Sequence, residues 1–378
     1  MNNKTIYIIF LVSMIWSSAP DYTIRDIKET SHIELLNSNI YETSLVSRVM
    51  DYNLIPLDNS NTKFKVSIDN GTSILKLGSP DLPKLTSSII IPDNVDMKLN
   101  IVSAQYTEFE NINIAPSKGN ITRDIDPFSI PFVYSDEYKQ NNFYPGNLAE
   151  LDESFILKDL RGQPVLFYPI QYNPVTKILR VYSEINVEIV ADQNSLSRNG
   201  KSRNSNKINA SNEFLHIYED LFINNLNDTR FEYLTDEGKM LIICYDDFLD
   251  AMQPFVDWKN RKGIHTDMIG ISEIGSSASS MQEYINSYYA QNDFSYLLLV
   301  GDINQMPTHI VNGAASDPSF GFIEGDDSYA EVIVGRFSAN NPEELQTQID
   351  RTLDYELGPE FVDHLDNAVG IASNQGPG

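Results

Sequence analysis

The sequence predicts a multidomain chain, with an all-β, sandwich-like N-terminal domain followed by an α/β domain built on a doubly wound parallel sheet. At 378 residues the chain is too long for one ordinary core. Residues 20–192 contain many short strand-like runs broken by Pro, Asn and Gly, which is typical of an antiparallel sandwich. After residue 231, strand-like and helix-like runs alternate, and this favours a parallel sheet with helices on both faces.

Alternation of apolar and polar residues indicates the strands of the first domain. In "EINVEIV", Ile185, Val187 and Ile189 fall on one face of an extended segment, with polar residues between them. The stretches "SSIIIPDNVDMKLNIVSAQY" and "RGQPVLFYPIQYNPVTKILRVYS" contain further short strands, and no convincing helical run interrupts them. We therefore place a β-rich domain at residues 20–192.

A compositional break follows at residues 193–230. Its first part, "QNSLSRNGKSRNSNKINASN", has no acidic residue, is poor in apolar groups and holds Arg198, Lys201, Arg203 and Lys207. In so acidic a chain this composition predicts an exposed linker, either a protease-accessible connection or a plain loop.

The second domain, at residues 231–378, is predicted from continuous apolar runs and helix caps. Strands covered on both faces are expected at "MLIICY", "HTDMIGI", "YLLLVGD", "EVIVGRF" and "AVGIAS". Ser280 and Glu283 predict a capping box for the helix "MQEYINSYYAQN". In "NPEELQTQIDRTLDYELG", Asn341 is the expected cap and Gly358 the expected terminator.

The N-terminal sequence and the net charge limit where the protein can be located and which partners it can bind. Residues 1–19 have the anatomy of a signal peptide, with Lys4, a short apolar run and then small residues, so we expect export to the cell surface or the medium. No stretch is long and apolar enough to span a membrane. The net charge of −26 disfavours binding to nucleic acid or to anionic membranes. The single cysteine, Cys244, excludes an intrachain disulfide.

Acidic residues follow one of the predicted parallel strands. Asp302 ends "YLLLVGD", at the edge of the sheet where sites form in such folds. In "IEGDDSYAE", Asp327, Tyr329 and Glu331 are two apart, so in an extended segment they share one face. Calcium is bound by carboxylate and carbonyl oxygens. The spacing therefore allows either a calcium site or a solvated acidic turn.

Motifs for several other chemistries are absent from the sequence. There is no HExxH, no paired CxxC, no GxGxxG and no lysine-bearing phosphate loop, so metalloprotease, zinc-finger and nucleotide-binding functions lose their usual support. Cys244 lies within an apolar run, which predicts a buried and inert thiol. No nucleophile and base pair is evident.

Longer stretches resemble one known family. "FVDWKNRKG", "YLLLVGD", "SDPSFGFIEGDDSYAEVIVGRFS" and "TQIDRTLDYE" occur in the order and spacing of gingipain-type cysteine peptidases. Upstream, "GSPDLPKLTSSIIIP" and "YNPVTKILRVYSEINVEI" resemble the inhibitory pro-domain of that family. The resemblance implies a secreted zymogen, whose β-rich pro-domain packs on a catalytic domain of two α/β subdomains, the second of them caspase-like.

The resemblance also implies which residues carry function. Residues 231–378 match the first subdomain, whereas the family's catalytic histidine and nucleophilic cysteine lie further on, so we expect the chain to stop inside the catalytic domain. Gln375 matches the acidic position that orients that histidine, although an amide cannot supply a full charge. Arg230 matches the position at which the pro-domain is released. The positions that match the family's structural calcium ligands are Asp302, Asp327 and Glu331 by side chain, and Glu324 and Tyr329 by backbone carbonyl.

We therefore expect the precursor of a secreted, calcium-stabilised cysteine endopeptidase that acts on proteins or peptides, and we expect residues 1–378 alone to be catalytically silent. Two alternatives stay open. Sortases of the type IX secretion pathway share this peptidase fold and would use the same dyad for transpeptidation. A genuine short product could instead act as a binding or inhibitory module, with the pro-domain blocking a related protease.

Overall fold

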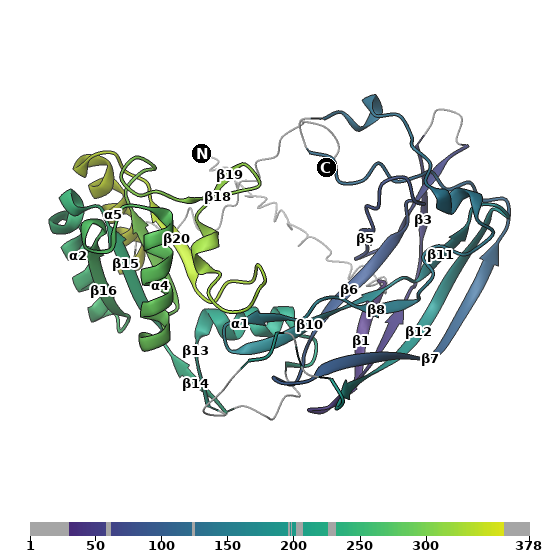
Figure 1. Ribbon diagram of the computed structural model, residues 1–378, viewed down its shortest axis with the longest axis horizontal. Helices are drawn as coiled ribbons and strands as arrows, with labels where there is room; N and C mark the ends of the chain where they lie inside the picture. Colours follow the sequence, from purple (N-terminus) through teal and green to yellow (C-terminus); the bar gives the residue numbers. More distant parts are fainter. Residues whose placement is uncertain are drawn as a thin grey trace, which may run out of the picture.

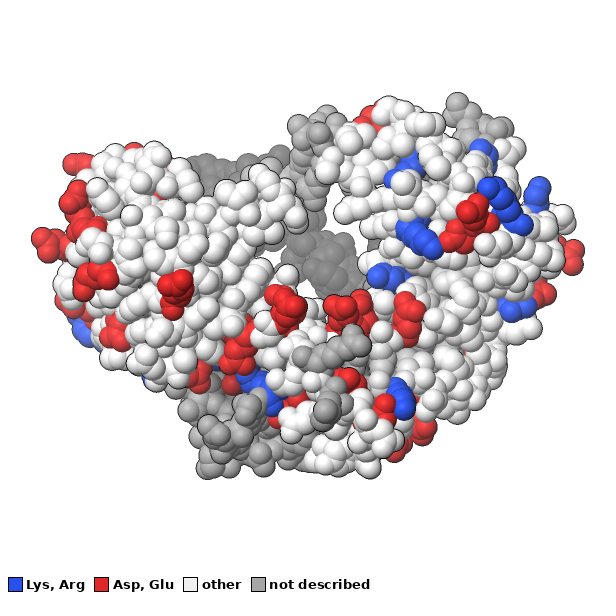
Figure 2. All heavy atoms as spheres, in the orientation of Figure 1, with Lys and Arg blue, Asp and Glu red and all other residues white. Residues whose placement is uncertain are grey.

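The structure, a computed structural model, describes residues 30–57, 62–122, 125–195, 197, 199–201, 207–225 and 232–358. These residues form two lobes, a strand-rich lobe from the first part of the chain and an α/β lobe from the second (Figure 1). Most of the Lys and Arg side chains visible in Figure 2 lie on the strand-rich lobe, whereas acidic side chains are spread over the α/β lobe and the junction.

The strand-rich lobe consists of two five-stranded antiparallel sheets and a few smaller elements. The first sheet has the order β1 (His32–Ser38), β2 (Glu42–Arg48), β12 (Ile178–Asp192) and β11 (Ile170–Asn173), with β7 (Asp96–Phe109) also paired to β12. The second has the order β5 (Thr72–Ser73), β6 (Pro83–Ile90), β10 (Leu160–Phe167) and β8 (Ala149–Leu151), with β9 (Phe155–Leu157) also paired to β10. The smaller elements are β3 (Asn53–Pro56), β4 (Phe64–Ser67), η1 (Pro127–Ser129) and η2 (Asp136–Lys139).

The core of this lobe lies between its two sheets. Ile185, Val187 and Ile189 of β12 are at most 1% exposed, as their alternation in the sequence predicts. They belong to one apolar cluster with Leu85 of β6 and Phe167 of β10, which come from the other sheet. Two sheets that share one core confirm the predicted sandwich.

The predicted linker, residues 193–230, contains regular structure and buried residues in its described part, so this part is less exposed than predicted. It contains β13 (Lys207–Ser211) and α1 (Asn212–Leu221), and β13 pairs in parallel with β14 (Glu232–Asp236). Phe214 and Tyr218 of α1 are 1% and 0% exposed, because they pack with apolar residues of β9 and β10. The basic, polar composition ends before α1, where apolar residues recur at helical spacing instead.

The α/β lobe is built on a four-stranded parallel sheet. Its order is β16 (His265–Gly270), β15 (Lys239–Cys244), β17 (Tyr296–Val300) and β20 (Ile333–Phe337). Its helices are α2 (Leu249–Arg261), α3 (Ile271–Ile274), α4 (Ala278–Asn292) and α5 (Pro342–Leu357). The remaining elements of the lobe are η4 (Asp246–Phe248), β18 (His309–Val311), β19 (Ala314–Ser316) and η5 (Pro318–Gly321).

Helices cover both faces of this sheet (Figure 1). Ile242 of β15 packs in one cluster with residues of α2 and α5, whereas its neighbours Leu241 and Ile243 pack in another with residues of α3 and α4. Successive side chains of a strand point to opposite faces, so a strand that is apolar throughout needs cover on both. This arrangement confirms the predicted doubly wound sheet.

One of the two predicted helix caps is confirmed and the other is wrong. The Asn341 side chain accepts a hydrogen bond from the Glu344 N–H at the start of α5, which ends before Gly358 as predicted. The cap of α4, however, is Ser277, and Ser280 supplies the third helical position of its capping box. The helix thus begins one turn earlier than the Ser280 and Glu283 pattern predicted, because serine is a favoured N-cap at either position and Ser280 can also close the earlier capping box.

Among the described residues, no helix is long and apolar enough to cross a membrane. The predicted signal peptide, the processing residue Arg230, the predicted strand at residues 368–373 and Gln375 lie outside the described residues.

Candidate functional site

Four of the five predicted calcium ligands lie on one loop at the junction of the two lobes. This loop, residues 323–331, is called the acidic loop below, and it faces the hairpin formed by β9 and β10, called the pro-domain hairpin (residues 155–162). The acidic loop forms no regular strand. Asp327, Tyr329 and Glu331 all contact the pro-domain hairpin, although the extended segment on which a shared face was predicted does not form.

Asp327 accepts hydrogen bonds from three groups. Its Oδ2 accepts from the Ile156 N–H at 2.9 Å and, at 3.4 Å, from the Asn199 side-chain amide. Its Oδ1 accepts from the N–H of Tyr329 at 2.9 Å, which closes a local turn. The carboxylate therefore fastens the acidic loop to two separate segments of the first part of the chain.

Glu331 is fully buried, with 0% exposure. Its Oε2 accepts from the backbone N–H groups of Ile323 and Glu324, at 2.8 and 3.0 Å. Its Oε1 accepts from the Lys158 N–H of the pro-domain hairpin at 3.4 Å. Burial raises the pKa of Glu331 to about 7, although these three N–H donors favour the charged form. The side chain thus closes the acidic loop on itself and onto the hairpin.

Tyr329 contacts the hairpin through its ring, which stacks on that of Phe155. Phe155 in turn stacks on Phe222, with centroids 5.9 Å apart. These rings border an apolar cluster that also contains Phe214 and Tyr218 of α1. The junction therefore has a small aromatic core of its own, built from both lobes.

A buried arginine fixes the segment at residues 199–201 beside this junction. Arg161 is 0% exposed, and its Nε donates to the Asn199 carbonyl at 2.7 Å. Its other nitrogens donate to the carbonyls of Pro92 and Val95, to Asp96 and to Ser154. With Asn199 held in this way, Lys201 forms an ion pair with Glu324 of the acidic loop, and the Lys201 side chain is only 10% exposed.

Asp302 does not join the acidic loop. Its Oδ1 accepts from the Ser338 hydroxyl at 2.8 Å, and this hydrogen bond is the main cause that lowers the pKa of Asp302. Nearby, Arg336 forms two 2.7 Å hydrogen bonds with Asp317 and donates to the carbonyls of Gly301 and Met306. No site predicted from the sequence includes Arg336, although a lone arginine in a parallel strand is a signal for a buried partner.

The predicted ligand set does not fit a metal ion in this arrangement. Among the described residues, no group of three or more His, Cys, Asp or Glu side chains could hold a metal ion. The oxygens of Asp327 and Glu331 already accept hydrogen bonds from N–H groups, and Asp302 accepts one from the Ser338 hydroxyl, away from the acidic loop. Calcium binding by this set therefore stays a prediction.

The one thiol of the chain is buried, as predicted. Cys244 is 0% exposed, and burial raises its pKa to about 12. None of the described histidines makes a hydrogen bond to it; the Cys244 thiol donates instead to the Tyr245 carbonyl. Cys244 is therefore neither exposed nor ionised, both of which a nucleophile requires.

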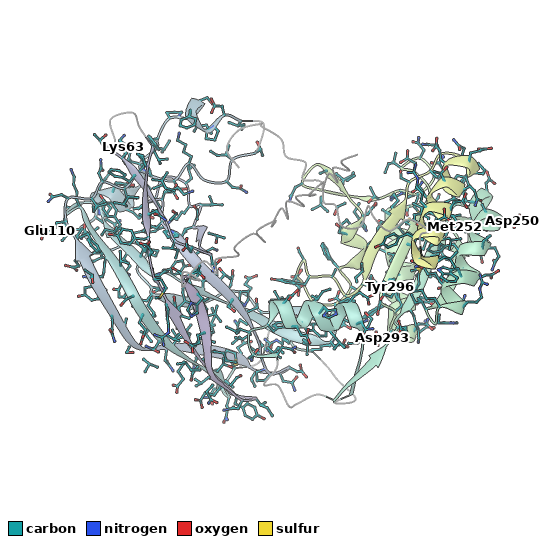
Figure 3. The ribbon with its side chains drawn as sticks, turned by 180° about the vertical axis from the view of Figure 1, so that it is seen from behind. Lys63, Glu110, Asp250, Met252, Asp293 and Tyr296 are labelled. Atoms are coloured by element: carbon teal, nitrogen blue, oxygen red, sulfur yellow. The ribbon has the colours of Figure 1, made fainter. Side chains whose placement is uncertain are left out.

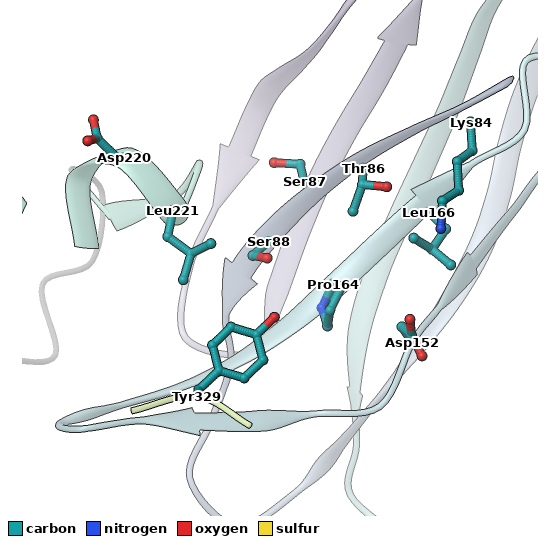
Figure 4. Close-up of a pocket in the computed structure, with 10 residues that line it drawn as sticks. All are labelled: Lys84, Thr86, Ser87, Ser88, Asp152, Pro164, Leu166, Asp220, Leu221 and Tyr329. Atoms are coloured by element: carbon teal, nitrogen blue, oxygen red, sulfur yellow. The ribbon is translucent and has the colours of Figure 1, made fainter. Parts of the chain in front are cut away.

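An open cavity of about 470 Å³ lies beside the junction (Figure 4). It runs over β6 and β10 and is bounded by Leu221 of α1 and by Tyr329 of the acidic loop. Its lining contains neither histidine nor cysteine. This cavity therefore contains no thiol and imidazole pair.

Comparison with known proteins assigns the two lobes. A family model of the C25 propeptide matches residues 27–223, which is more than half of the chain, and a model of peptidase family C25 matches residues 233–377. The chain belongs to peptidase family C25. It carries the propeptide of this gingipain-type cysteine endopeptidase family and part of its peptidase domain, so the resemblance in the sequence is confirmed. The propeptide match extends past β12, the last strand of the sandwich, to include α1.

Individual relatives agree with this assignment. Gingipain R1 of Porphyromonas gingivalis is 41% identical over 313 residues, which cover 81% of this chain and 31% of that protein. Gingipain R2 of the same species is 39% identical over 317 residues, which cover 81% of this chain and 42% of that protein. The chain therefore spans less than half the length of these relatives.

A solved structure is similar as well. The complex of Porphyromonas gingivalis RgpB pro- and mature domains shares 34% identity with this C25 chain at a TM-score of 0.46, covering 51% of this chain and 95% of that one.

Proposed function

We propose that this chain belongs to a secreted zymogen of a gingipain-type cysteine endopeptidase, and that its propeptide keeps the peptidase part latent by binding it at the junction. The observation that carries the proposal is the contact between the pro-domain hairpin and the acidic loop. The backbone N–H of Ile156 donates to Asp327, and that of Lys158 donates to Glu331. The ring of Phe155 stacks on that of Tyr329. The two regions that match the propeptide and the peptidase thus share one interface.

The catalytic thiol of the proposed enzyme is not Cys244. That thiol is buried with a raised pKa, and residues 1–378 contain no other cysteine. Acyl transfer needs a thiolate, a base and oxyanion donors in one place. Residues 1–378 should therefore hydrolyse no peptide by themselves.

A pair of assays tests the proposal. The purified chain, incubated with fluorogenic peptides and reducing agent, should release no product above that of a Cys244→Ala variant. The secreted precursor that contains residues 1–378 should, after processing, cleave peptides, and iodoacetamide should abolish this cleavage by labelling a cysteine other than Cys244. A secreted precursor without thiol-dependent cleavage would contradict the proposal. The product masses would separate hydrolysis by water from transfer to an amine.

A further inference from the structure

The lysine at the tip of the pro-domain hairpin is buried in the α/β lobe. Lys158 and Asp159 form the two-residue turn between β9 and β10, and Lys158 has a positive φ of 47°. Its side chain is only 1% exposed, although lysine is among the residues least often buried. A buried ammonium must be compensated by hydrogen bonds and charge, so its surroundings require explanation.

The compensating groups come from the end of α4. The Lys158 Nζ donates to the Asp293 Oδ1 at 2.9 Å and to the Phe294 carbonyl at 3.1 Å. Asp293 caps the C-terminus of α4 in a left-handed conformation, with a φ of 42°. The C-terminal end of a helix carries partial negative charge, which adds to the attraction of the carboxylate.

Two aromatic rings flank the same ammonium. The Nζ lies 5.2 Å from the ring centroid of Phe214 and 5.3 Å from that of Tyr289, both within the range of cation–π attraction. Tyr289 belongs to α4, whereas Phe214 belongs to α1 of the propeptide. The site therefore combines a carboxylate, a carbonyl and aromatic walls, which is how proteins recognise organic cations.

Acidic groups outnumber basic ones around the pocket, and the nearby Lys201 is paired with Glu324. Burial and the negative charges of Glu324, Asp293, Asp159 and Glu331 raise the pKa of Tyr289 far above its usual value. Asp293 itself is 55% exposed, so the pocket is open to solvent on its carboxylate side. Figure 3 shows Asp293 at the junction, beside α1 and away from the outer helices.

We propose that Asp293, the Phe294 carbonyl and Tyr289 form a primary-ammonium pocket of the peptidase part, which Lys158 occupies here and which accepts a lysine side chain of another polypeptide once the propeptide has left. These three groups lie within six residues of one another and remain together when the propeptide departs. The pocket is independent of peptidase activity, whereas its use after release rests on the proposed zymogen function. A guanidinium is wider and planar, so arginine should fit less well than lysine.

Removal of the natural occupant tests the pocket in the intact chain. In Lys158→Ala, n-butylammonium and Nα-acetyl-lysine amide should bind saturably in calorimetric titrations and raise the Tm by several degrees. Wild type, whose pocket is filled, should show neither effect. Nα-acetyl-norleucine amide, which lacks the ammonium, should not bind the variant, and the arginine analogue should bind at least tenfold more weakly than the lysine amide.

Substitution of the Asp293 carboxylate, compared with that of a distant one, provides the matched control. Adding Asp293→Asn to Lys158→Ala should abolish probe binding, whereas adding Asp250→Asn, on the far side of the α/β lobe in Figure 3, should leave it unchanged. A folded Lys158→Ala that binds no ammonium probe, or binding that survives Asp293→Asn, would overturn the proposal. If Lys158→Ala does not fold, n-butylammonium in the refolding buffer should restore folded yield, and failure to restore it would also overturn the proposal.

Discussion

The rings of Tyr329 and Phe155 lie face to face, with centroids 3.7 Å apart and planes 10° from parallel. Tyr329 belongs to the region that matches the peptidase family and Phe155 to the region that matches the propeptide. Phe155 is 2% exposed, so both faces of its ring are in contact with protein. This pair joins the two family regions through apolar contact as well as through hydrogen bonds.

Replacing Phe155 should therefore weaken the junction. We expect Phe155→Ala to lower the free energy of unfolding by about 3–5 kcal/mol, because it removes a buried ring and leaves a cavity. Phe128→Ala, at a side chain that is 76% exposed, is the matched control and should have little effect. Urea unfolding of both variants provides the measurement, and equal losses would show that Phe155 has no special role.

We expect that even lysine cannot replace Arg161 without a loss of stability. Its guanidinium donates to five groups, and a lysine ammonium has too few donors, at the wrong spacing, to replace them. We expect Arg161→Lys to cost about 3 kcal/mol or more and to free residues 199–201. Trypsin cleavage after Lys201, followed by mass spectrometry, should become faster. Arg48→Lys, at a half-buried site whose pairing with Glu34 and Glu184 a lysine can keep, should leave both quantities nearly unchanged.

The Arg336–Asp317 pair should make stability depend on pH. The Arg336 hydrogen bonds lower the pKa of Asp317 below 3.8, so the stabilisation is present above the unfolded pKa and is lost as pH falls through the folded one. We expect Asp317→Asn to cost about 3 kcal/mol at pH 7 and progressively less below pH 4. Asp354→Asn, at an exposed site, should track wild type. A loss that stays constant down to pH 2 would argue against this linkage.

The sequence and the geometry lead to opposite predictions about calcium binding, so calcium provides a test. In the precursor, Asp327 and Glu331 already accept hydrogen bonds from N–H groups, and Asp302 is bonded to Ser338 instead, so we expect no rise in Tm when millimolar calcium replaces a chelator. Magnesium at equal ionic strength controls for screening. A rise specific to calcium, lost in Asp327→Asn, would instead support the sequence-based prediction.

Local patterns in the sequence predicted most of the fold. A strand covered on one face alternates apolar and polar residues, as Ile185, Val187 and Ile189 do, and a strand covered on both faces is apolar throughout, as the one with Cys244 is. The sequence pattern therefore reports which faces are covered. Both ends of α5 followed from Asn341 and Gly358. The start of α4 did not, because Ser277 and Ser280 are both favoured N-cap residues and only packing distinguishes them.

The sequence predicted which residues of the acidic loop belong to the candidate site, but it did not predict their contacts. The spacing of Asp327, Tyr329 and Glu331 predicted a shared face on an extended segment, whereas the structure has a loop whose three side chains reach one hairpin. The partners of this loop lie far along the chain, with Ile156 and Asp327 separated by 171 positions. No periodicity relates residues so distant, and Lys158 resembles a surface lysine in a turn until the fold places it against Asp293.

The parallel pairing of β13 with β14 bears on how the precursor would come apart. Parallel strands cannot be joined by a tight turn, and here α1 lies within the connection, which also contains Arg230. A cut after Arg230 would sever that connection and leave the strand pairing intact, now between two polypeptides. The propeptide would then bind its enzyme by strand addition, and its departure would require a strand to peel away after the peptide bond has been broken.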